Sequence, residues 1–143
     1  IFATILAFLG AKMKIFYYEF TVGEDAIDVN HHANNAHYVI WMQEAANAHS
    51  NAVGDLIETN LAQNRTWMVR RHEIDDLGQL FLGDKVSVKT WTQPEKRSCS
   101  KRFYEFSKDG VPVASAVTTY VFFDLARGRP IAIPPEIAKL YED

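Results

Sequence analysis

Apolar and polar residues follow two different spacings in separate segments of the chain. Alternation is typical of a strand with one buried face, and a spacing of three to four residues is typical of a helix with one buried stripe. Residues 14–22, KIFYYEFTV, are aromatic and β-branched and therefore predict a strand. The polar segment that follows, residues 23–34, predicts a loop.

A long helix is predicted from about Asn35 to Gly54. Its buried stripe recurs at spacings of three and four and comprises Tyr38, Trp41, Met42, Ala45, Ala48, His49 and Ala52. The alanines after Met42 keep the stripe small, so this half of the helix can approach a sheet closely. Glycine is a frequent residue just past a helix end, so Gly54 predicts where this helix stops.

Most of the remaining chain predicts strands. The segments are 66–75, 85–93, 98–107 and 111–124. In the second of them Val86, Val88 and Thr90 share one face. Lys108-Asp109-Gly110 is a strong hairpin turn signal between the last two strands. The tail PPEIAKLYED predicts a short helix with proline in its first turn.

The predicted order is a strand, a long helix and then four strands. This order favours an α+β fold in which an antiparallel sheet of five or more strands wraps around one central helix. The helix covers only one face of such a sheet, and its edges stay open. Association into homodimers or homotetramers is therefore expected.

Length and composition narrow the class of protein. A chain of 143 residues fits one domain, and its 48% hydrophobic content is ordinary for a globular protein. A net charge of -3 gives no electrostatic footprint for nucleic acid or anionic membranes. The one cysteine, Cys99, excludes an internal disulfide and is expected to be a small packed residue. No metal or cofactor is expected, and a reducing cytoplasm is the expected location.

The start of the chain differs from the rest. Residues 1–11 form an apolar run that is too short to span a bilayer, which takes about 20 helical residues. We expect residues 1–12 to be a non-native or disordered extension, or alternatively the tail of a truncated signal. Residues 13–143 are expected to form the single domain.

The chemistry-bearing segment is Asp28–Tyr38, which holds a carboxylate, three histidines and three asparagines at a helix start. The first N–H groups of a helix are unpaired and can stabilise the oxyanion formed when a thioester carbonyl is attacked. A carboxylate just upstream can act as a nucleophile or a general base. The composition alone also fits a polar loop in which Asn34 caps the helix and the histidines are solvated.

The order of these residues resembles the signature of hot-dog acyl thioesterases. DVNHHANNAHYVIWMQEA is most similar to the motif Asp-Val-Asn-Gln-His-Val-Asn-Asn-x-x-Tyr of plant acyl-carrier-protein (acyl-ACP) thioesterases. The 4-hydroxybenzoyl-CoA thioesterase family shares the Asp and its setting. The resemblance continues through VRRHEIDDLGQLFLGDKVSVKTWT and ARGRPIAIP and covers about residues 14–134. It implies a hot-dog fold and the hydrolysis of acyl-CoA or acyl-ACP.

The resemblance also implies residue roles. Asp28 matches the nucleophile or general base, and Asn30 and His32 match polar residues that orient the substrate or share the proton transfer. The backbone N–H of Asn35 matches the donor that polarises the carbonyl. The chain departs from the motif in two ways. Ala33 stands in place of Val, which widens the expected pocket, and Ile74 follows Glu73 where the acyl-ACP branch has a Glu-Cys pair.

Several other polar residues are candidates for substrate contact or for the surface. Asn34 is a candidate substrate-binding residue, as are Arg70 and Arg71. The basic residues on or beside strands are expected to contact CoA phosphates or an acidic carrier protein, or else to keep an outer sheet face solvated; they are Arg70, Arg71, Lys96, Arg97, Lys101 and Arg102. His31, His37 and His49 are expected to be solvated or to lie at an interface.

Two other functions compete with thioester hydrolysis. One is a hot-dog dehydratase or hydratase. Such enzymes usually have a histidine followed by a Phe-Pro-Gly-type turn, and this sequence has none. The other is a non-catalytic hot-dog module that binds acyl-CoA. A sensor of that kind normally carries a DNA-binding segment, and the sequence contains no helix-turn-helix or basic arm.

Overall fold

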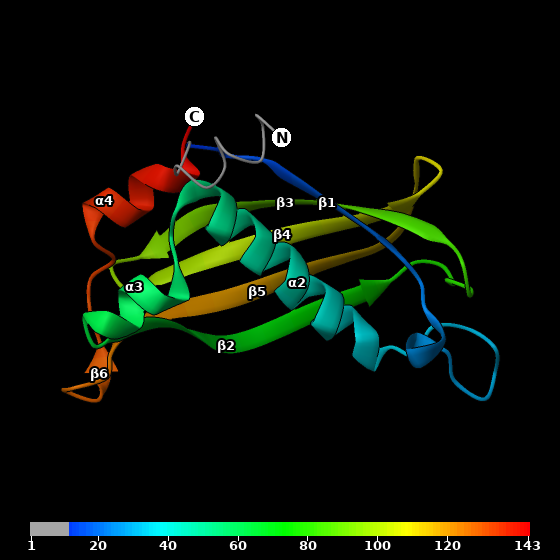
Figure 1. The fold of residues 1–143 in the computed structure, drawn as a ribbon, viewed down its shortest axis with the longest axis horizontal. Coiled ribbons are helices and arrows are strands. Elements are labelled where there is room, and N and C mark those ends of the chain that lie inside the picture. Colours follow the sequence, from blue (N-terminus) through cyan, green and yellow to red (C-terminus); the bar gives the residue numbers. More distant parts are fainter. Residues whose placement is uncertain (1–11) are drawn as a thin grey trace.

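The computed structural model describes residues 12–143, which form one curved sheet and a long helix that lies across it (Figure 1). The strands are β1 Phe16–Thr21, β2 Arg65–Asp76, β3 Lys85–Lys96, β4 Cys99–Lys108, β5 Val111–Asp124 and β6 Arg129–Pro130. The helices are η1 Glu24–Ala26, α2 Ala36–Val53, α3 Ile57–Ala62, α4 Pro135–Ala138 and η2 Lys139–Tyr141.

The sheet is antiparallel throughout and has the order β1-β3-β4-β5-β2, with β6 paired to β5. Strand β1 therefore lies at one edge and β2 at the other, although β2 is the next strand after β1 in sequence (Figure 1). This sheet around a central helix is the predicted α+β hot-dog arrangement, and the prediction of at least five strands is confirmed.

The β4–β5 hairpin sets the register of the two central strands. Asp109 and Gly110 have φ values of 51° and 76°, the positive values required at both central positions of a type I′ turn. This turn places Lys108 opposite Val111. A β-branched residue at either central position would be strained, so the predicted turn residues match the observed geometry.

The stripe of α2 forms the core with the inner face of the sheet. Met42 and Ala45 are fully buried, and Tyr38 meets Phe106 edge-on with ring centroids 5.2 Å apart. Of the alanines predicted in the stripe, Ala45 and Ala52 are buried, whereas Ala48 is only partly buried. The helix ends at Gly54, whose φ of 87° is the left-handed conformation that glycine adopts without strain.

Two predictions about polar residues are wrong. His49 is fully buried, which agrees with its predicted place in the helix stripe but not with the expectation of a solvated or interfacial side chain, because its ring nitrogens find partners inside the fold. Arg102 is only 4% exposed rather than on an outer face. It alternates along β4 with Tyr104 and Phe106, and this period of two places all three side chains on the inner face.

Some elements were not predicted. Helix α3 lies in a segment that looked like a polar connection, and β6 has only two residues, too few to show a pattern. The expectations for residues 1–12 fall, except at Lys12, outside the described residues. Within the described part of the chain, no helix is long and apolar enough to cross a membrane. Cys99 is buried on β4, as expected.

Candidate active site

The connection between β1 and α2 folds into a tight turn around Asp28. The Asp28 N–H donates to the carbonyl of His32 at 3.0 Å, and the His31 N–H donates to the carbonyl of Asp28 at 3.1 Å. The Asn30 N–H donates to Asp28 Oδ1 at 2.9 Å. His31 takes a positive φ of 67° to close the turn. Asp28 therefore organises its own loop through one carboxylate oxygen and leaves Oδ2 without a partner among residues 12–143.

Backbone hydrogen bonds dock this turn onto the rest of the fold. The Ala33 N–H donates to the carbonyl of Leu80 at 2.8 Å, and the Asn34 N–H donates to the carbonyl of Ala26 at 2.7 Å. Asn34 Oδ1 accepts the N–H of Ala36 at 2.9 Å. The Asn34 side chain thus caps the first turn of α2, and the carboxylate-bearing turn is fixed relative to the helix start.

A polar cavity of about 350 Å³ lies at this helix start. Its lining includes five of the predicted site residues, namely Asp28, Asn30, His32, Asn34 and Asn35. The backbone N–H of Asn35 has no hydrogen-bond partner among the described residues. An unpaired N–H at the start of an 18-residue helix carries partial positive charge and is available to a ligand oxygen.

The opposite wall of the cavity comes from a part of the chain that the sequence did not indicate. Asp76 ends β2, and Gln79 and Leu80 follow it. Burial, together with the negative charge of Asp76, raises the pKa of the Tyr38 hydroxyl to about 12. The cavity therefore holds a second carboxylate and a tyrosine that stays protonated at neutral pH. Of the adjacent pair Asp75-Asp76, only Asp76 lines the cavity, and the segment that follows it is joined to the loop by the hydrogen bond from the Ala33 N–H to the Leu80 carbonyl.

The two arginines assigned to the substrate lie elsewhere. Arg70 and Arg71 are exposed in the middle of β2, beside the irregularity in its pairing with β5. Arg71 forms an exposed ion pair with Glu73 at 2.9 Å. Neither arginine lines the cavity at Asp28, so within one protomer the structure does not bring them to the other candidate residues.

The site contains the groups that acyl transfer needs. Asp28 offers a partly buried carboxylate, and the start of α2 offers a donor for a developing oxyanion. Among residues 12–143, no group of three or more His, Cys, Asp or Glu side chains is placed to hold a metal ion. The described side chains can thus support carboxylate-dependent attack on a carbonyl carbon.

Solved structures with this fold come from several bacteria. A 1,4-dihydroxy-2-naphthoyl-CoA thioesterase from Synechocystis has a TM-score of 0.84 at 17% identity, covering 90% of this chain and 96% of the other. A hypothetical protein from Staphylococcus aureus in complex with CoA has a TM-score of 0.83 at 20% identity, covering 91% and 84%. A predicted thioesterase from Bacillus stearothermophilus has a TM-score of 0.75 at 25% identity, covering 87% and 91%.

A comparison of the sequence with curated proteins gives no match. A sequence model of the thioesterase-like superfamily matches residues 22–140, which include the Asp28 turn, α2 and the strands from β2 onward. The resemblance to hot-dog acyl thioesterases is therefore confirmed, and the chain belongs to the thioesterase-like superfamily.

Proposed function

We propose that this protein hydrolyses acyl thioesters, with acyl-CoA or acyl-ACP as substrate and the free acid and thiol as products. The observation that carries the proposal is the shared cavity of Asp28 and the unpaired Asn35 N–H at the start of α2. Membership of the thioesterase-like superfamily supports the same reaction.

In the proposed reaction the Asn35 N–H donates to the thioester carbonyl oxygen and stabilises the negative charge that develops there. Asp28 acts in one of two ways. As a general base it takes a proton from water while the water oxygen attacks the carbonyl carbon; the C–S bond then breaks, and the leaving thiolate takes the proton from Asp28. As a nucleophile it forms a mixed anhydride and expels the thiolate, and water then cleaves the anhydride to regenerate the carboxylate.

The remaining candidates have supporting roles. Asn30 and His32 line the cavity and are proposed to orient the substrate or share the proton transfer. Asn34 already caps α2 through Oδ1, so its proposed contact with substrate uses the side-chain NH2 group. Contacts of Arg70 and Arg71 with CoA phosphates or a carrier protein, and a cytoplasmic location, stay predictions.

The function is tested by measuring thiol release from a panel of short, long and aromatic acyl-CoAs and from an acyl-ACP. Hydrolysis of any of these esters at a rate well above the uncatalysed one is the expected result. Binding of the esters without thiol release would contradict it and would favour the non-catalytic binding module.

We also propose that the protein forms a homodimer through β2. This strand has 12 residues and pairs with β5 on one side only, and its other edge has no strand partner among residues 12–143. Met68 and Val69 on it are each 44% exposed. A long edge strand without a strand partner is prone to pair with another chain, and two-fold symmetry makes such a pairing antiparallel.

Introducing charge on this edge is expected to separate the protomers. Sedimentation or light scattering of the wild type should give a dimer or a higher multiple, and the double variant Met68→Glu/Val69→Glu should give a monomer. Val111→Glu is the matched control, because Val111 is an exposed apolar residue that pairs with Lys108 on β4 and lies outside the pairing of β5 with β2. A monomeric wild type would overturn the proposed dimer.

A further inference from the structure

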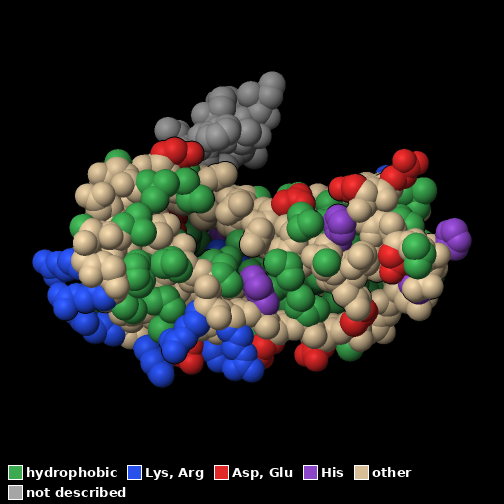
Figure 2. Space-filling model, turned by 90° about the horizontal axis from the view of Figure 1, so that it is seen from below, with side chains coloured by type: hydrophobic (Ala, Val, Ile, Leu, Met, Phe, Trp, Pro, Cys, Tyr) green, Lys and Arg blue, Asp and Glu red, His purple; other side chains and the backbone are tan. Residues whose placement is uncertain are grey.

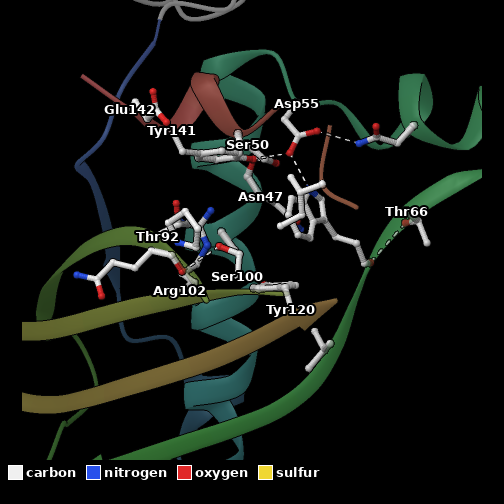
Figure 3. Close-up of a pocket in the computed structure, with 18 of the residues that line it drawn as sticks. Asn47, Ser50, Asp55, Thr66, Thr92, Ser100, Arg102, Tyr120, Tyr141 and Glu142 are labelled. Atoms are coloured by element: carbon white, nitrogen blue, oxygen red, sulfur yellow. Dashed lines mark hydrogen bonds between the residues drawn. The ribbon is translucent and has the colours of Figure 1, made fainter. Parts of the chain in front are cut away.

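A second cavity lies at the other end of α2. It has a volume of about 610 Å³ and shares no lining residue with the cavity at Asp28. Its walls are the C-terminal half of α2, the inner face of the sheet and the chain end around Tyr141 (Figure 3). A cavity of this size is typical of a site for a small organic ligand.

Arg102 lies in the floor of this cavity. Its Nη1 donates to His49 Nδ1 at 2.9 Å and to Thr90 Oγ1 at 3.0 Å. Its Nε and Nη2 have no hydrogen-bond partner among residues 12–143, and neither atom is sealed from the cavity. Figure 3 shows Arg102 reaching up from β4 between Thr92 and Ser100. Part of the guanidinium group is therefore free to bind a ligand.

The partners of Arg102 carry no negative charge. His49 Nε2 lies 2.7 Å from the carbonyl of Met13 and must donate to it, so Nδ1 is the unprotonated nitrogen that accepts from Arg102. Burial, and then the charge of Arg102, lower the pKa of His49 to about 4 against the opposing effect of the Met13 carbonyl. His49 is thus neutral at pH 7, as is Thr90.

Three acidic residues line the same cavity, namely Asp55, Glu142 and Asp143, and its four cationic residues still leave an excess of positive charge. Asp55, the buried one, is already fully engaged. Asp55 accepts hydrogen bonds from Asn60, Trp67 and Tyr141 at 2.8, 2.8 and 2.5 Å. Among residues 12–143, no carboxylate lies within 4.0 Å of Arg102. A cation that is 4% exposed and lacks an adjacent anion is costly unless a ligand supplies the charge.

The remaining walls suit an apolar body with an anionic end. Trp67, Tyr120 and Ile133 supply apolar surface, and Thr92 and Ser100 add hydroxyl groups beside Arg102. The cationic residues at the cavity are Lys14, Lys96, Arg97 and Arg102. Lys and Arg side chains gather toward this end of the molecule, whereas Asp and Glu predominate toward the other (Figure 2). These charges favour the entry of an anion over a cation.

We propose that this cavity binds a carboxylate carried on an apolar body and that Arg102 is its anion receptor. Guanidinium groups bind carboxylates through two parallel hydrogen bonds, and Arg102 keeps donors on Nε and Nη2 for this purpose. The ligand is a free carboxylic acid rather than the distal end of a bound thioester, because the two cavities share no lining residue and lie at opposite ends of α2.

Binding of free ligands tests the shared chemistry without any turnover. In calorimetry we expect octanoate to bind the wild type at least ten-fold more tightly than octanol, which has the same chain without the charge. Arg102→Gln should weaken octanoate binding at least ten-fold and leave octanol binding unchanged. Lys101→Gln is the matched control, because Lys101 is the neighbouring cation on β4 and lines neither cavity.

Equal binding of octanoate and octanol to the wild type would overturn the proposal even if Arg102→Gln does not fold. Octanoate binding without any hydrolysis would contradict only the proposed function.

Discussion

Replacement of Asp28 by Asn is expected to lower kcat for acyl-CoA hydrolysis by about a thousand-fold, within the range for loss of a catalytic base or nucleophile. Asn is uncharged, so it can neither take a proton from water nor attack the carbonyl carbon. Its side-chain oxygen can still accept the N–H of Asn30, which holds the turn. The loss should therefore appear in kcat, with an unchanged free energy of unfolding in urea.

Two further variants show whether the effect is specific to Asp28. Glu24→Gln removes an exposed carboxylate from the same connection without touching the cavity, and it should keep wild-type kcat. Asp76→Asn removes the other carboxylate of the cavity. If Asp28→Asn retained wild-type kcat while Asp76→Asn lost it, the proposed role would belong to Asp76.

The elements with a clear period could be predicted from the sequence. Helix α2 has a long regular stripe, β1 has an aromatic and β-branched composition, and Gly54 and Asp109-Gly110 have conformations that few other residues adopt. Helix α3 could not be predicted, because a six-residue helix shows less than two turns of periodicity. The hydrophobic pattern therefore predicts a helix or strand more reliably the longer the segment over which one face is buried.

Some residues of the candidate site could likewise be predicted from the sequence, and others could not. The turn residues from Asp28 to Asn35 are contiguous in sequence, so a motif could bring them together. Asp76 is distant in sequence and lines the cavity only through the tertiary fold, in which the Ala33 N–H donates to the carbonyl of Leu80 just after β2. Arg102 was assigned to the basic pairs by its charge, whereas its alternation with Tyr104 and Phe106 was the signal that it is buried. Charge alone was a poor guide to exposure.

Replacement of Asp55 by Ala is expected to destabilise the fold by about 3 kcal/mol, because it leaves buried donors without an acceptor. Asp55 is only 5% exposed and joins three separate parts of the structure. It accepts from Asn60 on α3, from Trp67 on β2 and from Tyr141 at the chain end. Urea unfolding monitored by circular dichroism measures the loss, and Glu58→Ala, an exposed carboxylate on α3, should change stability by less than about 0.5 kcal/mol.

The contribution of the chain end can be separated from the rest of this network. Tyr141→Phe removes one of the three donors and keeps the buried ring, so a loss of about 1 kcal/mol is expected. Because the two residues share one hydrogen bond, the double variant Asp55→Ala/Tyr141→Phe should lose less than the sum of the single variants. Strict additivity, or a loss below about 1 kcal/mol for Asp55→Ala, would contradict this network. A coupled loss would mean that Asp55 holds the wall of the Arg102 cavity in place, since Tyr141 covers the Arg102 guanidinium at 5.8 Å.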